Sequence, residues 1–535
     1  MTLAATSQTT SPSHITSRRS WWIVTWLAVA AAIFIRCWHL GSKSLWFDEG
    51  YTAWLVSHPV GEIIRLIRAD TAPPLYYVLV HGWTAIFGRS EIALRSLSTV
   101  FSILTLLLAI DIARRLLTNP AAVAAAACAM GLSFMQLWYA QEARAYAMMT
   151  FLIIAAFDCL LRHLAARHRR WLILLPILFA AAMYCHNMMA PYVLALLLAW
   201  LVLPSEHPLP RRIGEIAVVT FVAGLLYLPW AIGGLPAQMQ MIRRGFWADP
   251  LKHGAVFSDV ASLTGVQHYW SAANVFDRIH IRILDGRGPI LMTMILLGAS
   301  GMLSIVFQQG RRRREAIGLL IVALFPPFFV AIYSVLRTPL FIDKLFLPSA
   351  TLMPIFALLP LAMPLSRALF RAAWAGAAVL LFLSATTLYG YHNEGKKEQW
   401  RDVAGVVSQL PPTHRLIIFV ANDGQLPFDY YYHYRPGDEV TGVPGDFFDL
   451  NPPRTMRRAM SPEDLAPLRS RLDTHHYDQI VLLLAHQFWG DPHHLTRALI
   501  GERFSLAGHL EFYDVTVEWY QSNPTTRINT TQIKR

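Results

Sequence analysis

The sequence predicts a mainly α-helical membrane protein, with about eleven transmembrane helices, additional interfacial helices and a small soluble α/β domain at its C-terminal end. Of the 535 residues, 55% are hydrophobic and only 15% are charged, whereas soluble domains carry about 25% charged residues. The mean hydropathy is positive, at +0.38. Apolar runs long enough to cross a bilayer recur up to residue 390, and the composition turns polar from residue 391.

The net charge of +12 comes from short basic clusters beside the apolar runs. A nucleic-acid partner is not expected, because these clusters do not form a continuous basic patch or arm. The four cysteines all lie in or beside apolar segments, at or before residue 185. They are expected to be small core residues, which leaves the C-terminal domain without a disulfide.

The apolar runs predict the individual spans, since a helix needs roughly 20 apolar residues to cross the hydrocarbon. We expect them at about residues 20–38, 92–113, 119–137, 146–161, 171–185, 187–203, 214–232, 289–308, 316–335, 345–363 and 370–390. The uncharged stretch from Trp171 to Pro204 is too long for one crossing, so the polar break around His186 divides it. The shorter aromatic run from Pro73 to Phe87 is predicted to lie at the membrane interface.

The basic clusters predict the orientation of these spans. With the spans above, the arginine pairs and clusters at 18–19, 114–115, 162–170, 211–212, 311–314 and 367–371 all fall on one side, which the positive-inside rule assigns to the cytoplasm. We therefore expect a cytoplasmic tail (1–19), a transmembrane module (20–390) with outer loops 39–91 and 233–288, and an outer soluble domain (391–535). The first apolar run could be a signal peptide, but its length favours an uncleaved anchor.

The polar tail predicts a small α/β domain. Residues 416–420 and 479–484 are short apolar runs typical of buried strands, and residues 400–410 have helical periodicity. Residues 428–434 are a second candidate helix. The paired histidines at 475–476 and 493–494 lack the spacing of zinc ligands, so we interpret them as surface residues.

The strongest polar motif follows the first span, in Leu45-Trp46-Phe47-Asp48-Glu49-Gly50-Tyr51. Adjacent carboxylates at a membrane interface cost free energy unless they are solvated, paired or bound to a cation. Asp48 and Glu49 therefore have two interpretations: a hydrated turn, or a site that acts on a membrane-bound substrate.

A second motif, Glu142-Ala143-Arg144, lies at the outer end of the third span. Side chains two residues apart face different directions on a helix, so Glu142 and Arg144 need other partners. Arg144 is a candidate counter-ion for a phosphate or carboxylate, and Glu142 could help Asp48 and Glu49 hold a divalent cation. The alternative is a helix end whose charges reach out to water.

A third motif, residues 337–344, places Arg337 and Lys344 in a short outer turn. Cations on that side run against the positive-inside rule, which indicates an anionic partner such as a lipid phosphate. A simple ion pair between Asp343 and Lys344 is the alternative. His186, at the outer end of another span, is either a substrate ligand or a packing residue.

Taken together, these motifs resemble the GT-C class of integral membrane glycosyltransferases. The resemblance is to the family 39-like group, which contains protein O-mannosyltransferases and bacterial lipid A sugar transferases. It rests on LWFDEGYT after the first span, TAPPLYY in the interfacial segment, YAQEARAYA after the third span and the basic turn at 337–344, in that order. Residues 397–401 resemble the start of the periplasmic domain of bacterial members. Nucleotide-binding motifs such as a Walker loop or GxGxxG are not found.

The resemblance implies a multi-pass enzyme of the bacterial inner membrane, a hexosyl- or pentosyltransferase whose site and soluble domain lie on the periplasmic side. Its donor would be a sugar on a polyprenyl phosphate, and its acceptor a hydroxyl of a lipid, polysaccharide or protein. Asp48 matches the first-loop aspartate regarded as the catalytic base, Glu49 its neighbour, and Glu142 the second acidic position. Many relatives have arginine at Lys344, and lysine offers a point charge rather than a bidentate fork.

The implied reaction inverts the anomeric carbon, with Asp48 taking the proton of the acceptor hydroxyl. Arg144, Arg337 and Lys344 would bind the donor phosphate, while Glu142 and His186 would bind the acceptor or a cation. A cation such as Mg²⁺ or Mn²⁺ on Asp48, Glu49 and Glu142 is allowed by the motifs but not required. The alternative class is a lipid or sugar transporter or flippase. Against it, the charges gather at helix ends, not at mid-membrane, and no inverted repeat is visible.

Overall fold

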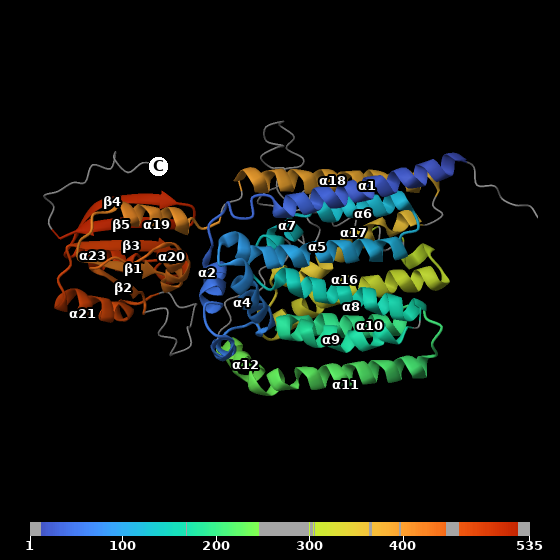
Figure 1. The fold of residues 1–535 in the computed structure, drawn as a ribbon, viewed down its shortest axis with the longest axis horizontal. Helices are drawn as coiled ribbons and strands as arrows, with labels where there is room; N and C mark the ends of the chain where they lie inside the picture. The colour runs from blue at the N-terminus through green and yellow to red at the C-terminus, as the bar shows by residue number, and fades with distance from the viewer. Residues whose placement is uncertain are drawn as a thin grey trace, which may run out of the picture.

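The computed structural model describes residues 12–166, 168–244, 305–362, 366–394, 397–445 and 460–522, together with residues 299 and 303. It has a helical bundle and a domain built on a β-sheet, which lie end to end in Figure 1. The helices of the bundle are α1 (Pro12–Cys37), α2 (Phe47–Leu55), α3 (Val60–Leu66), α4 (Leu75–Phe87), α5 (Glu91–Leu116), α6 (Pro120–Leu132), α7 (Phe134–Ala140), α8 (Tyr146–Ala166), α9 (Arg169–Cys185), α10 (Ala190–Val202), α11 (Leu209–Gly233), α12 (Leu235–Arg244), α16 (Gly310–Leu336), α17 (Leu347–Leu358) and α18 (Arg367–Glu394).

The predicted mainly helical membrane fold is confirmed. Each predicted span except 289–308 coincides with helix, and that segment lies almost entirely outside the described residues. Among the described helices, six are long and apolar enough to cross a bilayer, or seven if α6 and α7 form one span. This is fewer than the predicted eleven, partly because α9 and α10, with 17 and 13 residues, are shorter than a full crossing.

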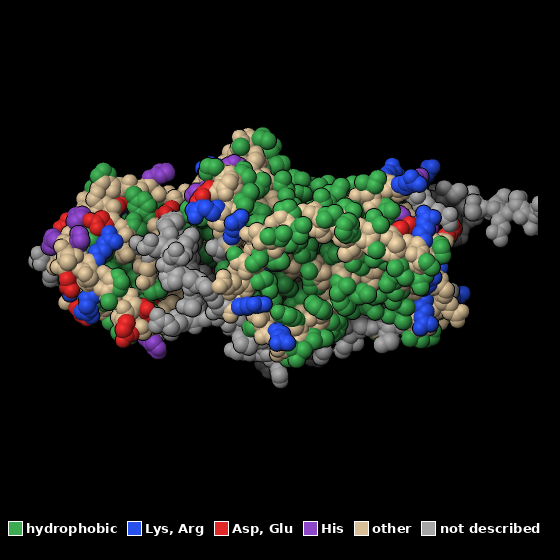
Figure 2. Space-filling model, turned by 90° about the horizontal axis from the view of Figure 1, so that it is seen from below, with side chains coloured by type: hydrophobic (Ala, Val, Ile, Leu, Met, Phe, Trp, Pro, Cys, Tyr) green, Lys and Arg blue, Asp and Glu red, His purple; other side chains and the backbone are tan. Residues whose placement is uncertain are grey.

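The surface of the bundle is apolar along most of its length. Outward-facing residues such as Ile173, Phe221 and Ile332 are exposed, which is expected where lipid and not water surrounds a helix. Figure 2 shows this apolar surface, with Lys and Arg side chains bordering it at both ends. The chain is therefore a multi-pass membrane protein.

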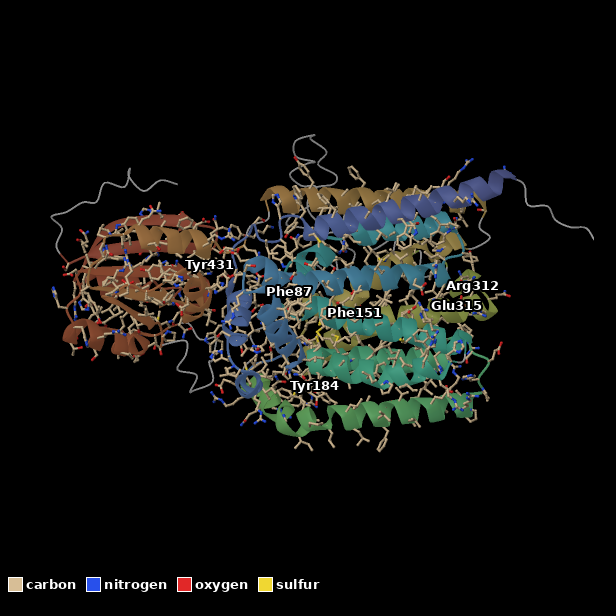
Figure 3. All side chains as sticks on the ribbon, viewed as in Figure 1. Phe87, Phe151, Tyr184, Arg312, Glu315 and Tyr431 are labelled. Carbon is tan, nitrogen blue, oxygen red and sulfur yellow. The ribbon has the colours of Figure 1, made fainter. Side chains whose placement is uncertain are left out.

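One end of the bundle lies next to the sheet domain, and the other end lies away from it. Tyr431 lies where the bundle meets the sheet domain, and Arg312 and Glu315 lie at the opposite end (Figure 3). We call the end next to the sheet domain the site end and the opposite one the far end. The short helices α2, α3 and α4 lie at the site end (Figure 1), which places the predicted interfacial run 73–87 in α4.

The span predicted at 119–137 is bent. α6 and α7 meet at an angle of 52°, because Ser133 at the break starts a new helix. Its hydroxyl accepts a hydrogen bond from the backbone N–H of Gln136, as an N-cap residue does. The bend directs α7 into the turn that carries Glu142 and Arg144.

The C-terminal domain is a mixed five-stranded sheet with helices on both faces. Its strands lie in the order β2-β1-β3-β5-β4; β1 is parallel to β2 and β3, whereas β5 is antiparallel to β3 and β4. Its elements are α19 (Trp400–Gln409), β1 (Arg415–Val420), α20 (Gln425–Tyr431), β2 (Asp438–Gly442), α21 (Ala466–Thr474), β3 (Gln479–Ala485), α22 (Gln487–Gly490), α23 (Leu495–Gly501), β4 (Ser505–Phe512) and β5 (Val515–Gln521).

Two apolar cores cover the two faces of this sheet, since alternate residues of a strand point to opposite sides. Ile417 and Phe419 of β1 pack with Trp400 and Phe428 from the α19 and α20 side. Ile418, one residue away from both, packs on the α21 and α23 side. The predicted α/β domain is confirmed, and the predicted strands at 416–420 and 479–484 are β1 and β3.

The sheet domain is bound tightly to α2. A Cβ added at Gly50 would come within 2.6 Å of the backbone nitrogen of Pro427, at the start of α20. The hydroxyl of Tyr431 accepts a hydrogen bond from the Leu45 N–H at 2.8 Å and also bonds to Glu91 of α5. The domain therefore holds the segment that carries Asp48 and Glu49.

Candidate active site

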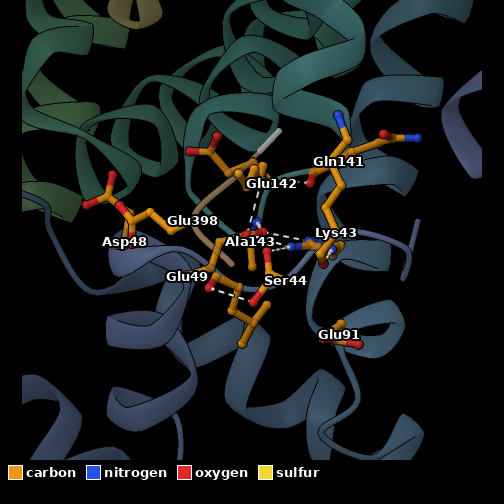
Figure 4. A network of polar contacts seen from close by, with 12 residues as sticks. Lys43, Ser44, Asp48, Glu49, Glu91, Gln141, Glu142, Ala143 and Glu398 are labelled. Atoms are coloured by element: carbon orange, nitrogen blue, oxygen red, sulfur yellow. Dashed lines mark hydrogen bonds and ion pairs between the residues drawn. The ribbon is translucent and has the colours of Figure 1, made fainter. Parts of the chain in front are cut away.

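The acidic pair lies in the first turn of α2. The helix begins at Phe47 after an extended Trp46, and carboxylates at a helix N-terminus are stabilised by the helix dipole. Consecutive helical residues point in directions about 100° apart, so Asp48 and Glu49 meet different neighbours. Figure 4 shows Glu49 within a network of polar contacts that also includes Ser44 and Ala143.

Glu49 is completely buried and fully paired. Arg95 of α5 donates to both of its oxygens at 2.7 Å, Lys397 donates at 3.1 Å, and the backbone N–H of Ala143 donates at 3.0 Å. Burial raises the pKa of Glu49, but Arg95 and Lys397 outweigh it and hold that pKa at about 2. Its contacts join α2, α5, the α7–α8 turn and the start of the sheet domain.

Asp48 has looser contacts on the other side of α2. Its Oδ2 lies 3.5 Å from Nζ of Lys344 and 3.7 Å from Nε of Arg144, longer than the 2.7–2.9 Å of a charge-assisted hydrogen bond. Burial raises the pKa of Asp48, but Arg144 and Lys344 together lower it below its usual value. Asp48 is therefore ionised, held between two cations, and retains capacity to accept a further proton.

The two cations come from distant parts of the chain. Arg144 lies in the turn between α7 and α8, and Lys344 lies in the short 3₁₀ helix η5 (Asp343–Phe346) between α16 and α17. The Arg144 guanidinium lies 5.9 Å from the ring centre of Tyr77, and Lys344 Nζ lies 5.1 Å from that of Tyr146. Aromatic faces stabilise such cations without neutralising them. The structure thus brings together three predicted site residues: Asp48, Arg144 and Lys344.

Glu142 is buried beside this cluster. Its Oε2 accepts a hydrogen bond from Nε1 of Trp138 at 2.8 Å, while Oε1 has no hydrogen-bond partner among the described residues. Burial, with contributions from Glu49 and Asp48, raises the pKa of Glu142 to about 7, against the opposing effects of Lys397 and Lys344. This carboxyl group can therefore change its protonation state near neutral pH.

His186 lies between α9 and the 3₁₀ turn η2 (Asn187–Met189). Its Nδ1 accepts a hydrogen bond from the Met188 N–H at 3.1 Å, so the proton of the neutral ring is on Nε2. Burial and the nearby cations Arg144 and Lys344 lower the pKa of His186 to about 3. The ring is thus a neutral donor at the site end.

Arg337 is placed differently from the other predicted phosphate ligands. It ends α16 and is exposed, and no ion pair between it and Asp48 occurs in the part of the chain that the structure describes. Its role in phosphate binding stays a prediction.

The arrangement of charges offers little support for a cation on Asp48, Glu49 and Glu142. Both oxygens of Glu49 are occupied by protein donors, and Asp48 faces two basic side chains. Within the described ranges, the three acidic residues are not among the groups whose ligand atoms lie within 4.8 Å of one another. Metal binding by these three residues stays a prediction, and the proposed reaction uses only the protein's own cations.

Three further residues of the site, two of them buried and one partly buried, were not identified from the sequence. Arg95 and Lys397 pair with Glu49. Asp70, beside α4, keeps a buried Oδ2 without a hydrogen-bond partner among the described residues, and burial raises its pKa despite nearby Arg144. The signal for Arg95 was present, because a charged residue within an apolar span indicates a buried partner. Lys397 and Asp70 lie in polar segments, where the sequence carries no such signal.

Comparisons with known proteins identify relatives of the fold and of part of the sequence. Residues 71–232 match the family model for dolichyl-phosphate-mannose-protein mannosyltransferases. No curated protein matches at the sequence level. The crystal structure of ArnT from Cupriavidus metallidurans in the apo state is similar, with a TM-score of 0.58, 15% identity, and coverage of 94% of this chain and 98% of that one.

A second structure of the same protein, bound to undecaprenyl phosphate, matches with a TM-score of 0.53 at the same identity and coverage. The shared fold extends over both the bundle and the sheet domain, whereas the family match lies within the bundle. These findings confirm the resemblance predicted from the sequence: the chain has the GT-C fold of integral membrane glycosyltransferases, and residues 71–232 carry the sequence pattern of the mannosyltransferase family.

Proposed function

We propose that the protein transfers a sugar from a polyprenyl-phosphate donor to an acceptor hydroxyl, with inversion at the anomeric carbon and with Asp48 as the general base. The observation that carries this proposal is the position of Asp48 between Arg144 and Lys344, at 3.7 and 3.5 Å. Such a transfer requires a base to accept the proton of the acceptor hydroxyl and cations to bind the donor phosphate. Both cations lie within ion-pair distance of Asp48. The ArnT structure bound to undecaprenyl phosphate, a lipid of the same class, supports the choice of donor.

The two cations would receive the phosphate of the donor. As the sugar–phosphate bond breaks, the leaving phosphate gains negative charge, and cations already in place stabilise it without reorganising. Arg144 and Lys344 are both mostly buried, with side chains 11% and 15% exposed. In such surroundings a charge interaction is stronger than in water.

Phosphate binding would also prepare the base. In the free protein Arg144 and Lys344 lower the pKa of Asp48, which keeps it ionised but makes it a weak base. A bound phosphate would offset the two positive charges and raise this pKa again. Asp48 would therefore become a better proton acceptor only when the donor is present.

Glu142 and His186 are proposed to bind the acceptor. The neutral His186 ring can donate from Nε2, and Glu142 has a free acceptor atom, Oε1, among the described residues. Acceptor hydroxyls both donate and accept hydrogen bonds, so one residue of each kind suits them. The class of acceptor stays open between lipid, polysaccharide and protein hydroxyls.

We also propose that the site end faces the periplasm of a bacterial inner membrane. The far end carries the basic clusters, including residues 311–314, and the positive-inside rule places such clusters in the cytoplasm. Lipid-linked sugar is the donor expected on the opposite side, where nucleotide sugars are not available.

The test is the variant Asp48→Asn, assayed for sugar transfer from lipid-linked donors in proteoliposomes. Loss of the base is expected to lower kcat by about 10²- to 10⁴-fold. Binding of polyprenyl phosphate should be unchanged or tighter, because the substitution removes a negative charge beside Arg144 and Lys344. Loss of donor binding together with kcat would contradict this assignment.

The exposed surface residue Glu502, which pairs with Arg469 in the sheet domain, supplies a control variant, Glu502→Gln. It should transfer sugar at the parent rate. Parent-level transfer by Asp48→Asn would exclude the proposed base. Absence of transfer by the parent chain with every lipid-linked sugar tested would favour a transporter.

A further inference from the structure

Two histidines and a glutamate come together at the far end of the bundle, remote from Asp48. His163 lies in the last turn of α8, His207 in the connection between α10 and α11, and Glu215 in the second turn of α11. One ligand atom from each lies within 4.8 Å of the other two. Both histidines are almost completely buried, with 3% and 2% of their side chains exposed.

Both imidazole rings point a nitrogen at the same carboxylate. Nε2 of His163 lies 3.1 Å from Oε2 of Glu215, and Nδ1 of His207 lies 3.4 Å from the same oxygen. Charge-assisted hydrogen bonds are shorter, about 2.7–2.9 Å. Neighbouring ligands of a tetrahedral zinc ion with bonds of about 2.0–2.1 Å lie roughly 3.3 Å apart. Both contacts lie within hydrogen-bond range, and both separations also match those between two zinc ligands.

The other ring nitrogens show that this is not a completed hydrogen-bond network. Nδ1 of His163 and Nε2 of His207 are buried without a hydrogen-bond partner in the described part of the chain. Neutral rings that donate to Glu215 and rings that bind a metal ion would both leave these two nitrogens without a partner, so it is the three converging ligand atoms that favour a metal ion. Arg211 reaches Oε1 of Glu215 at 3.1 Å, which leaves Oε2 available for a metal ion.

We propose that His163, His207 and Glu215 bind a zinc ion, with water as the fourth ligand. Two histidines and one carboxylate form an established zinc donor set, and zinc has no strong geometric preference of its own. The ion would join three separate segments, α8, the α10–α11 connection and α11. The site lies at the opposite end of the bundle from Asp48, so we infer a structural role that is independent of the proposed sugar transfer.

The test uses the full-length chain in detergent, stripped of metal with a chelator and titrated with Zn²⁺ or Co²⁺. One zinc ion per chain is expected to remain after gel filtration. Co²⁺ should give the visible absorption of a tetrahedral site. Zinc should also raise Tm, because a ligand that binds only the folded state stabilises it.

The variants His207→Gln and Glu215→Gln are expected to weaken zinc binding by at least about tenfold, as loss of even an outer-shell partner does, and to abolish the zinc-dependent rise in Tm. His168→Gln is the matched control, because His168 is an exposed histidine nearby at the start of α9. Zinc bound by surface histidines elsewhere would persist in all three variants and can be subtracted.

A parent chain without stoichiometric zinc and without a tetrahedral Co²⁺ spectrum would overturn the proposal, whatever the variants do. Equal zinc content and equal Tm shifts in the parent and His207→Gln would overturn it as well. Sugar transfer should be unchanged in His207→Gln at temperatures where it stays folded. A negative result in the metal measurements therefore does not contradict the proposed function, and a failure of sugar transfer does not contradict the zinc site.

Discussion

The two sides of α2 place neighbouring carboxylates in opposite situations. On one side Glu49 is fully buried, receives four hydrogen bonds, two of them at 2.7 Å, and belongs to a junction of three segments with the sheet domain. On the other side Asp48 faces Arg144 and Lys344 at 3.7 and 3.5 Å, and its side chain is 16% exposed. Two neighbouring carboxylates therefore have different surroundings within one helical turn.

This difference in pairing predicts different roles for the two carboxylates. A carboxylate whose oxygens are all engaged by fixed donors is a poor proton acceptor, because protonation would break a buried ion pair. A carboxylate whose ion-pair contacts are long, as those of Asp48 are, can exchange these partners for a substrate. We therefore propose that Glu49 positions α2, and that Asp48 performs the proton transfer.

The largest expected effect is that of Glu49→Gln on stability. This change leaves Arg95 and Lys397 buried with one partner fewer, and breaking a buried pair typically costs about 3–5 kcal/mol. We expect a large decrease in thermal stability in detergent. Asp48→Asn should leave stability nearly unchanged, since its ion pairs are long.

Thermal unfolding of the two variants, followed side by side, measures this contrast. Equal decreases in Tm for Glu49→Gln and Asp48→Asn would mean that the two sides of α2 do not differ in the way described.

Glu142 is buried like Glu49, but its Oε1 has no hydrogen-bond partner among the described residues. Its pKa is raised from about 4.5 to about 7. The folded protein therefore holds this proton at pH values where the unfolded chain releases it, so stability falls as pH rises from 4.5 to 7. Above pH 7 the cost of the buried charge is constant.

Glu142→Gln removes that cost, because an amide stays neutral and can still accept from Trp138. The variant should match the parent at pH 4.5 and exceed its stability at pH 8, by on the order of 3 kcal/mol. The measurement is Tm as a function of pH. A Tm difference between the variant and the parent that does not depend on pH would contradict the raised pKa of Glu142.

The sequence predicted much of this arrangement, and its failures have physical causes. Apolar runs and basic clusters were sufficient to bring Asp48, Arg144 and Lys344 to one end of the bundle. The resemblance assigned the base to Asp48, but the pairing of Glu49 with Arg95 and Lys397 was not accessible, because it depends on the residue at which α2 begins. Lys397 pairs with Glu49 across 348 positions of sequence, and no local pattern encodes such a contact.

The strands of the sheet domain were also predicted only in part. The continuous apolar runs of β1 and β3 were recognised, since both strands are buried on both faces. β2 and β4 are polar and only partly buried, and they lie at the two edges of the sheet. Edge strands of this kind resemble loops in sequence.

The proposed role of Asp48 as the base can be tested through the pH dependence of activity. Lys344 and Arg144 lower the pKa of Asp48, so activity should be retained at higher pH and lost as pH falls through this lowered pKa. Lys344→Met removes one cation, and an opposite charge at this range lowers a carboxyl pKa by about one unit or more. The acid limb of the kcat/KM profile should therefore move to higher pH by about one unit.

The variant Lys344→Arg keeps the charge and serves as the matched control, with an unshifted acid limb. Lys344→Met should also bind polyprenyl phosphate more weakly. An acid limb at the same pH in Lys344→Met and in the parent would remove Asp48 from its proposed role as the titrating base.

The smallest expected effect tests whether the sheet domain positions α2. Glu398, at the start of that domain, accepts from the Phe47 N–H at 3.1 Å and from Nε1 of Trp400 at 2.6 Å, and lies 3.0 Å from Nε2 of His486. Phe47 is the first residue of α2, and a negative charge at a helix N-terminus contributes about 0.3–1 kcal/mol. Glu398→Gln should therefore lower kcat about two- to fivefold without changing donor affinity.

The same variant has a second readout through His486. Burial lowers the pKa of His486, but hydrogen bonds with Asp423 and Glu398 outweigh it and raise that pKa to about 11. The contribution of protonated His486 to the free energy of unfolding is complete below pH 6.5 and is lost as pH rises towards 11. Between pH 7 and 10, Tm should therefore fall less steeply in Glu398→Gln than in the parent. The control Glu502→Gln should retain the parent slope, because an exposed pair contributes little. Identical slopes and identical kcat in Glu398→Gln and Glu502→Gln would mean that α2 keeps its position without help from the sheet domain.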